Sequence, residues 1–382
     1  MGKDDPPGKP SVPPSVVPRS VPPTSTPRSV PPHSVAPHSV APNTPRSVPP
    51  NTPRSTRPLP ARPTKLGRFE VLAKIATGGM ASIYLGRDEK GGVVALKVMR
   101  PERAAEDEDI MKMFFDEANL LLRLHHPNIV HTIEVGAEGD QRFIAMELLL
   151  GMPLVAIVDA CTQKGLRIDP DLVAWVGARM AEGLHHAHEA RDDAGGSLSL
   201  VHRDVNPSNV FVTFDGGIKL FDFGMAKLTT RTAAKTAPGI VKGKLPYLAP
   251  EQIMQLALDR RADIFGFGTT LWELLTMRRL FQRPNDVETV KAVHVGPIPD
   301  VKSLVPEVPP KLAAIVHKAL ERNREHRFAT ALEMGHALEE IASPRGATAP
   351  ARLSQMLDSL FPAERKRQLG FLKPAIYSPK PR

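Results

Sequence analysis

Polar and hydrophobic residues alternate in several short stretches between residues 69 and 147, the pattern of strands with one buried face. In the first stretch, Phe69, Val71, Ala73 and Ile75 would lie on the same side of a strand. The expected strands are 69–75, 82–87, 93–99, 129–135 and 142–147, with a helix at 107–124 between the third and fourth. This region is therefore expected to form a small five-stranded sheet with one helix.

From Gly151 onwards, apolar residues recur at spacings of three and four, which is typical of amphipathic helices. The expected helices are 154–163, 170–190, 262–278, 287–294, 309–321 and 329–342, with one more short helix at 352–360. The most apolar stretch, 262–277, contains Asp263 and Glu273, so we interpret it as a buried helix. The sequence thus predicts an α+β protein, with a small sheet lobe at 68–150 and a larger, mainly helical lobe at 151–342.

Residues 1–67 differ in composition from the rest of the chain. They hold half of the 40 prolines, no Phe, Tyr or Trp, and nine basic residues against two acidic ones. Short units such as Ser-Val-Pro-Pro recur there, and such a segment cannot bury enough apolar area to offset its ordering entropy. We expect a disordered Pro-rich arm, which is either a spacer or a docking or phosphorylation segment for a partner. Both interpretations fit the residues.

Residues 343–382 form a basic C-terminal tail, and the last twenty are expected to be loose. Because both ends are basic, the central residues carry a small excess of acidic side chains. A nucleic-acid-binding domain would carry positive charge on a folded face, so we do not expect nucleic acid as a partner. Cys161 is the only cysteine, and the chain has neither a secretory signal nor an apolar run of membrane-spanning length. We therefore expect a cytoplasmic protein without a membrane span.

The polar residues with the clearest chemistry lie between residues 201 and 224. Asp204 and Asn209 belong to the run His-Arg-Asp-Val-Asn-Pro-Ser-Asn, and Asp222 begins Asp-Phe-Gly after an intervening hydrophobic strand. At this spacing Asp204 can accept a hydroxyl proton, while Asn209 and Asp222 can bind magnesium ions that bridge the phosphates of a nucleotide. The run resembles the catalytic core of the eukaryotic-like protein kinases, in particular the bacterial serine/threonine kinases.

The resemblance extends to the predicted sheet lobe. Lys97 ends a Val-Ala-Leu-Lys run and resembles the lysine that pairs with the α- and β-phosphates of ATP, and Glu117 is its expected ion-pair partner. The loop after the first strand resembles the Gly-rich loop over the phosphates. Gly78 is its middle glycine, but Ala76 and Ala81 stand where the family has glycine.

The resemblance also implies where ATP and Mg²⁺ would bind. Met146 would lie beside the adenine, and Glu147 and Leu149 would offer main-chain groups to its edge. Ala95 and Phe211 would enclose the adenine ring. The loop residues expected at the nucleotide are Ile75, Ala76, Thr77, Gly78, Gly79, Met80, Ala81 and Ile83.

Two positions depart from the serine/threonine kinase pattern. Asn206 stands where that family has a lysine two residues after the catalytic Asp, and Lys244 stands where it has a threonine. In the family fold these two side chains meet beside the catalytic Asp. We therefore expect Lys244 to supply an ammonium group to Asp204, with Asn206 as a hydrogen-bond partner. A Lys244 that points to solvent is the alternative.

Other residues of the pattern imply regulation and structural support. Arg203 suggests control by phosphorylation of the activation segment, with Thr236 favoured and Thr232 second. Glu251 is expected to pair with Arg327, and Asp263 to anchor the backbone of the loop that carries Asp204. Two groups of histidines do not have zinc-site spacing; they are His125, His126 and His131, and His185, His186 and His188.

The sequence thus predicts a serine/threonine protein kinase that transfers the γ-phosphoryl group of Mg-ATP to protein hydroxyls and phosphorylates its own activation segment. Arg203 favours a protein substrate over a small molecule, and nothing in the residues points to tyrosine. The alternative is a pseudokinase or scaffold that binds partners through its lobes and Pro-rich arm. Ala76, Ala81 and Asn206 favour that alternative.

Overall fold

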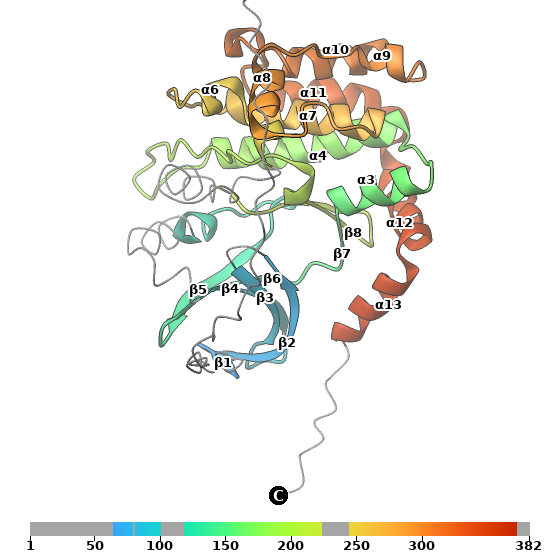
Figure 1. Cartoon of the computed structure of the whole chain (residues 1–382). Helices are drawn as coiled ribbons and strands as arrows, with labels where there is room; N and C mark the ends of the chain where they lie inside the picture. Colours follow the sequence, from blue (N-terminus) through green and yellow to red (C-terminus); the bar gives the residue numbers. More distant parts are fainter. Residues whose placement is uncertain (1–63, 79–80, 101–117, 224–243, 373–382) are drawn as a thin grey trace, which may run out of the picture. The chain divides into compact units, whose positions relative to one another are not determined.

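The computed structural model describes residues 64–78, 81–100, 118–223 and 244–372. Residues 61–382 form one compact unit, and residues 1–63 of the predicted Pro-rich arm lie outside the described residues. The predicted arm extended to residue 67, and this boundary was wrong, because Lys65 and Leu66 form a strand and Leu66 is fully buried. Within this unit the chain first forms an antiparallel sheet and then a mainly helical lobe (Figure 1). The predicted α+β arrangement of two lobes is confirmed.

The sheet lobe has six strands in the order β1-β2-β3-β4-β6-β5. Their bounds are β1 (Lys65–Leu66), β2 (Phe69–Thr77), β3 (Ala81–Arg87), β4 (Val93–Met99), β5 (Thr132–Glu138) and β6 (Gln141–Glu147). All five predicted strands are present, and β1 adds an edge strand because the fully buried Leu66 pairs with Phe69. Phe69 packs edge-to-face on Phe143 in the core of this lobe. The predicted helix at 107–124 is described only from residue 118, and residues 118–121 are helical.

The helical lobe is built around α7, whose residues are almost all buried. Its main helices are α3 (Leu154–Gln163), α4 (Pro170–His188), α7 (Arg261–Thr276), α8 (Asp286–Val295), α10 (Pro310–Ala319) and α11 (Ala331–Ala342), with short helices α6 (Pro250–Ile253) and α9 (Val301–Leu304). The six long helices predicted in this lobe are confirmed, with ends that differ by a few residues. The Phe265 ring of α7 stacks on Phe281 with a centroid distance of 5.7 Å, which places large aromatic side chains at the centre of the core.

A second, three-stranded sheet has the order β7-β8-β9. Its strands are β7 (Gly151–Pro153), β8 (Val210–Thr213) and β9 (Ile218–Leu220). A side chain at position 151 would place its Cβ 2.1 Å from the carbonyl oxygen of Val212, so only glycine lets β7 approach β8 this closely. This small sheet fixes the ends of the segments that carry the polar motif.

Two helices follow the large lobe, α12 (Ala349–Leu360) and α13 (Pro362–Leu369). The first contains the predicted helix at 352–360. The last twenty residues were expected to be loose, and this was wrong for those that belong to α13. A buried contact of Gln368 with Gly151 holds that helix in place. Among all helices in the described part of the chain, none combines the length and the apolar character needed to cross a lipid bilayer.

Candidate active site

The hairpin of β8 and β9 brings the two halves of the polar motif together. Val210 pairs with Leu220, and the Phe221 N–H donates to the carbonyl oxygen of Asn209 at 3.2 Å. Asp222 is the next residue, so it lies beside Asn209 although the sequence separates them by a strand, a turn and a second strand. Both predicted metal-binding residues are thus held at one end of the same small sheet.

The Asp204 carboxylate is buried, with 3% of the residue exposed, and each of its oxygens accepts hydrogen bonds. Asn206 Nδ2 donates to Oδ1 at 2.7 Å, and Asn209 Nδ2 donates to Oδ2 at 2.8 Å. The Lys244 ammonium also contacts Oδ2 in an ion pair. The structure therefore brings Lys244 and Asn206 to Asp204, as the sequence predicted, and does not turn Lys244 away from it.

Lys97 and Asp222 meet between the sheet lobe and the β8–β9 hairpin. Lys97 lies in β4, and its ammonium forms an ion pair with Asp222 Oδ1. Burial by itself would raise the pKa of Asp222, but the positive charge and hydrogen bond of Lys97, with smaller effects of Lys244 and His202, hold that pKa below its usual 3.8. Asp222 is therefore anionic at neutral pH, as a magnesium ligand must be. Glu117, the predicted partner of Lys97, lies outside the described residues.

Two residues of the site have an unusual backbone: Arg203, in the loop that carries Asp204, and Asp222, which follows β9. Arg203 has a φ of 66° and Asp222 a φ of 60°, a left-handed conformation that costs energy for residues other than glycine. Asp263 supports the loop, because its carboxylate accepts the N–H groups of His202 at 2.8 Å and Arg203 at 2.6 Å. The prediction that Asp263 anchors this backbone is confirmed.

Asp263 is itself held by a buried histidine. His188 Nε2 lies 2.7 Å from Asp263 Oδ2, and both side chains are almost fully buried. Burial alone would raise the pKa of Asp263, but the hydrogen bond and charge of His188, followed by His202, lower it from 3.8. The backbone of the loop that carries Asp204 is therefore held by the ionised carboxylate of Asp263.

Two further contacts support the site, and the first of them was predicted from the sequence. The Arg327 guanidinium binds both carboxylate oxygens of Glu251, at 2.6 Å and 2.9 Å, in a buried bidentate pair. The rings of His202 and Phe223 pack with a centroid distance of 4.3 Å. These contacts hold Phe223 of the Asp-Phe-Gly run and the segment that begins at Pro250.

The residues predicted at the phosphates lie at the turn of the β2–β3 hairpin and in the strand residues next to it. The Gly78 N–H donates to the Ala81 carbonyl oxygen at 2.9 Å, and Ala76 pairs with Ile83. The described loop residues that the sequence assigned to the nucleotide are Ile75, Ala76, Thr77, Gly78, Ala81 and Ile83. Gly79 and Met80 lie outside the described residues. The hairpin therefore stays intact with alanine at the two positions where the kinase pattern has glycine.

The residues predicted around the adenine lie on neighbouring strands. Ala95 of β4 pairs with Met146 of β6. Leu149 belongs to residues 148–150, which join β6 to β7, and we call this segment the hinge. Phe211 lies on β8, edge-to-face with Phe221 at 6.3 Å between centroids. Ala95 and Phe211 therefore come from the sheet lobe and the helical lobe, respectively.

Glu147 makes a contact that the sequence did not predict. Its N–H donates to the His131 carbonyl oxygen at 2.9 Å, and its carboxylate accepts from Lys219 Nζ at 2.7 Å. Lys219 lies in β9, so this ion pair connects the start of the hinge to the hairpin that carries Asp222. No motif or spacing in the sequence signals such a pair.

Asn209 and Asp222 fit a magnesium ion. The Asn209 amide nitrogen already donates to the main-chain oxygen and Oδ2 of Asp204, which leaves the amide oxygen as its metal-binding atom. Mg²⁺ prefers oxygen ligands and commonly takes one or two protein groups together with substrate phosphates. Within the described ranges, no cluster of three or more His, Cys, Asp or Glu side chains could bind a metal. The protein would thus supply only part of the coordination, and nucleotide phosphates the rest.

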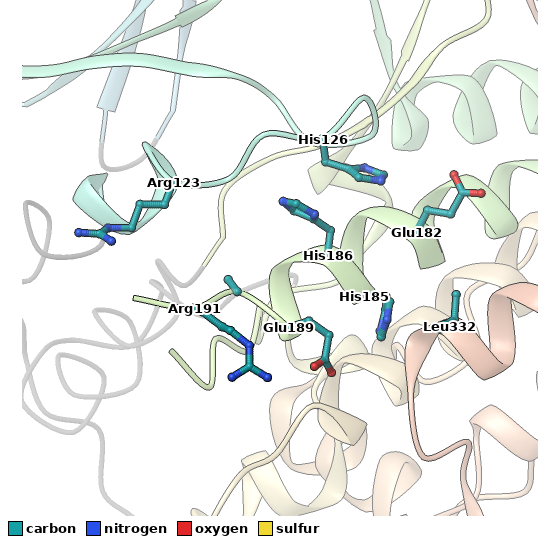
Figure 2. Close-up of a pocket in the computed structure, with 9 residues that line it drawn as sticks. Arg123, His126, Glu182, His185, His186, Glu189, Arg191 and Leu332 are labelled. Carbon is teal, nitrogen blue, oxygen red and sulfur yellow. The ribbon is translucent and has the colours of Figure 1, made fainter. Parts of the chain in front are cut away.

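A cavity of about 560 Å³ lies at a different place, against α4 (Figure 2). It contains His126 and His186, whose rings pack with centroids 5.0 Å apart. Burial, the largest effect, lowers the pKa of both histidines. The cavity does not include Asp204 or Asp222. We assign no chemistry to it.

Comparison with known proteins gives matches to protein kinases. The sequence pattern described as "Protein kinase domain" matches residues 69–338. Tyrosine-protein kinase MasK of Myxococcus xanthus is 39% identical over 281 residues, which cover 72% of this chain and 43% of MasK. Serine/threonine-protein kinase PknL of Mycobacterium tuberculosis is 34% identical over 276 residues, covering 72% of this chain and 66% of PknL.

More distant matches have the same character. Serine/threonine-protein kinase PrkC of Bacillus subtilis is 32% identical over 269 residues, covering 70% of this chain and 39% of PrkC. The crystal structure of the Mycobacterium tuberculosis PknI kinase domain superposes with a TM-score of 0.55 at 26% identity, and covers 73% of this chain and 97% of that domain. The chain thus spans less than two thirds of the length of MasK, PknL and PrkC.

Proposed function

Because the chain belongs to the protein kinase domain family, we propose that it transfers the γ-phosphoryl group of Mg-ATP to serine and threonine hydroxyls of proteins. One observation carries the proposal: the structure brings together the predicted catalytic side chains that it describes. Lys97 contacts Asp222, Asp222 lies beside Asn209, and Asn209 and Lys244 contact Asp204.

Each residue has a role that follows from its contacts. ATP supplies the phosphoryl group, and the magnesium ions offset the charge of its phosphates. Lys97 binds phosphate oxygens, and Asn209 and Asp222 hold the metal. Asp204 accepts the proton of the attacking hydroxyl as the new oxygen–phosphorus bond forms and the bond to ADP breaks. Lys244 and Asn206 hold the Asp204 carboxylate in one orientation, so little rearrangement is needed during the reaction.

The type of residue that accepts the phosphate is inferred from the relatives. PknL and PrkC carry the name serine/threonine-protein kinase, which supports serine and threonine, whereas MasK is named a tyrosine-protein kinase. The similarity to MasK makes tyrosine the alternative acceptor. We further propose Thr236 and then Thr232 as sites of autophosphorylation; both lie outside the described residues.

The test is transfer of labelled phosphate from ATP, with magnesium, to a generic basic protein, followed by phosphoamino acid analysis. We expect phosphoserine and phosphothreonine from the wild-type chain, and a loss of at least about a thousandfold in Asp204→Asn and Asp222→Ala. Phosphotyrosine alone would replace the serine/threonine proposal with the alternative. A folded wild-type chain no more active than Asp222→Ala would point to the scaffold instead.

Autophosphorylation has a separate readout. Mass spectrometry of the wild-type chain should find phosphate on Thr236 or Thr232, and none on either residue in Asp222→Ala. A wild-type protein that transfers phosphate to the basic substrate but carries none on its own activation segment would contradict this part of the proposal alone.

A further inference from the structure

The two C-terminal helices lie beyond the part of the chain that matches the kinase family, which ends at residue 338. They are nevertheless packed on the large lobe. Leu353 and Leu357 of α12 are 1% and 0% exposed and belong to the core of that lobe. The Arg352 guanidinium binds Asp171 at 2.5 Å and also contacts Asp169, at the start of α4. α12 is therefore fixed to the lobe by both apolar burial and charge.

α13 continues from α12 (Figure 1). The side chain of Gln368 connects α13 to Gly151 of β7. Gln368 is 8% exposed, and its Oε1 accepts the Gly151 N–H at 2.8 Å. Its Nε2 donates to the Gly151 carbonyl oxygen at 2.9 Å. One amide thus binds both main-chain groups of a single residue, which fixes the position and the orientation of that peptide segment.

Neighbouring contacts orient the Gln368 amide. Glu364, one turn earlier in α13, accepts from Gln368 Nε2 at 2.8 Å. The Arg365 guanidinium lies 5.6 Å from the centroid of the Phe214 ring, so α13 also contacts the segment after β8. The Phe214 N–H in turn donates to the Leu150 carbonyl oxygen at 2.9 Å. The contact at Gly151 is therefore part of a small buried network.

Gly151 is the residue at which the hinge ends. It directly follows residues 148–150, and Leu149, whose main chain we assign to the adenine edge, lies two residues before it. Substitution of Gly151 would force β7 away from β8, so this residue cannot carry a side chain to fix its own position. The side chain that holds its main chain is Gln368 of α13, which comes 217 residues later in the sequence.

We propose that Gln368 is a positioning residue for the nucleotide, through which the C-terminal helices hold the hinge main chain in the shape that binds ATP. This inference rests on the proposed function. A hinge that is already ordered loses less conformational freedom when the nucleotide binds, so affinity is higher than it would be without the clamp. By linkage, bound nucleotide must also strengthen the contact of α13 with Gly151.

The test uses Gln368→Met in the full chain, because methionine is similarly long and unbranched but forms neither hydrogen bond. Lys366→Ala, at an exposed position of the same helix, is the control. We expect the dissociation constant of a fluorescent ATP analogue, and the KM for ATP, to rise about fivefold in Gln368→Met. We expect kcat to stay unchanged, because Gln368 contacts none of the catalytic side chains, and Lys366→Ala to behave like the wild type.

Two results with Gln368→Met would overturn the inference. The first is a variant that melts at a lower temperature but binds the nucleotide as tightly as the wild type. The second is a variant with a lower kcat and an unchanged KM for ATP.

A third result needs only the wild type, so it can be obtained even if the variant does not fold. We expect the ATP analogue to slow hydrogen exchange of the α13 amides. Unchanged exchange would show that α13 and the nucleotide site are not coupled.

These readouts separate this inference from the proposed function. A wild-type chain that binds the analogue but transfers no phosphate would contradict the transfer reaction only, because the titration still compares Gln368→Met with the wild type. A wild-type chain that binds no nucleotide would overturn both.

Discussion

At the scale of single residues, the surroundings of Asp204 decide how this kinase could work without the usual lysine at position 206. Lys244 reaches the Asp204 carboxylate from a later segment of the chain, while Asn206 donates to the other carboxylate oxygen. The cation and the hydrogen bond are both present, but their positions in the sequence are exchanged relative to the serine/threonine pattern. The positive charge next to the Asp204 carboxylate therefore comes from a residue 40 positions later in the chain.

If Lys244 supplies that charge, Lys244→Ala should lower kcat by about 10- to 100-fold, since preorganised charges at a reacting group contribute on this order. The measurement is steady-state transfer of labelled phosphate at saturating ATP. Adding Asn206→Lys to the Lys244→Ala chain should restore part of the lost rate, because it returns an ammonium group to the same carboxylate. Lys311→Ala, at a lysine that is 80% exposed, is the control. Full activity in Lys244→Ala would contradict the assignment.

The ion pair of Lys97 with Asp222 has a pH dependence of known sign. The pKa of Asp222 in the folded chain lies below 3.8, so the stability from this pair is fully present above about pH 3.8 and is lost as pH falls through the lower value. Lys97→Met removes the positive charge that contributes most to lowering the pKa of Asp222, so burial then raises the pKa of this carboxyl group.

We therefore expect the stability advantage of the wild type over Lys97→Met to shrink by about 1 kcal/mol or less between pH 7 and pH 3.5, since partly exposed pairs are screened by solvent. Urea unfolding at both pH values measures it, with Lys90→Met, at an exposed lysine, as the control. An advantage that grows towards acid pH would have the wrong sign and would exclude this account of Asp222.

At the scale of secondary-structure elements, the catalytic loop is positioned mainly by helix α7 and its neighbours. Asp263, near the start of α7, holds two consecutive N–H groups of the loop, and His188, at the end of α4, holds Asp263. Glu251 of α6 is tied to Arg327, just before α11. Helices that are far apart in the sequence thus converge on the loop through buried charged groups, which have few alternative arrangements in a low-dielectric interior.

Breaking the ion pair of Glu251 and Arg327 should lower the stability of the fold considerably. Its side chains are 6% and 0% exposed, so Arg327→Met leaves a buried carboxylate without its partner and should lower the free energy of unfolding by about 3–5 kcal/mol. Urea unfolding measures the loss, and Arg278→Met, at an exposed arginine, is the matched control. Replacing Glu251 by Leu as well should recover part of the loss. A cost below about 1 kcal/mol would mean that Glu251 finds another partner.

At the scale of the whole molecule, the large lobe and helix α12 share one hydrophobic core, which is separate from the buried clusters of the sheet lobe. Leu353 and Leu357 of α12 belong to the same buried cluster as Phe265 and Trp272 of α7. Gln368 and Arg352 add polar contacts to the hinge and to the start of α4. The helices after residue 342 therefore stabilise the large lobe directly.

This packing predicts that α12 unfolds together with the large lobe. Leu357→Ala should cost about 2–5 kcal/mol, because it leaves a cavity at a fully buried site, and the unfolding curve should keep a single transition for this lobe. Leu369→Ala, at a leucine that is 47% exposed, should change the free energy of unfolding by about 0.5 kcal/mol or less. A Leu357→Ala chain as stable as the wild type would show that α12 is not part of the core.

The sequence by itself determined the repeating elements and the identity of the polar groups. Strand alternation and helical spacing are local patterns, so they predicted the strands from Phe69 to Glu147 and the long helices of the large lobe. The family motifs likewise predicted which of the described side chains, Lys97, Asp204, Asn209 and Asp222, would come together. These predictions succeeded because each depends on residues close together in the sequence or on spacings that the fold preserves.

Only the tertiary structure decided the contacts between distant segments that carry no repeating pattern. The pair of Lys219 with Glu147 and the clamp of Gln368 on Gly151 each join residues that no spacing relates. Helix α13 is too short and too polar for its sequence to predict a stable helix, and it exists because its one buried polar side chain finds both main-chain groups of Gly151. Local sequence thus determines most of the elements, whereas long-range burial and pairing of polar groups determine α13 and how the elements hold the site.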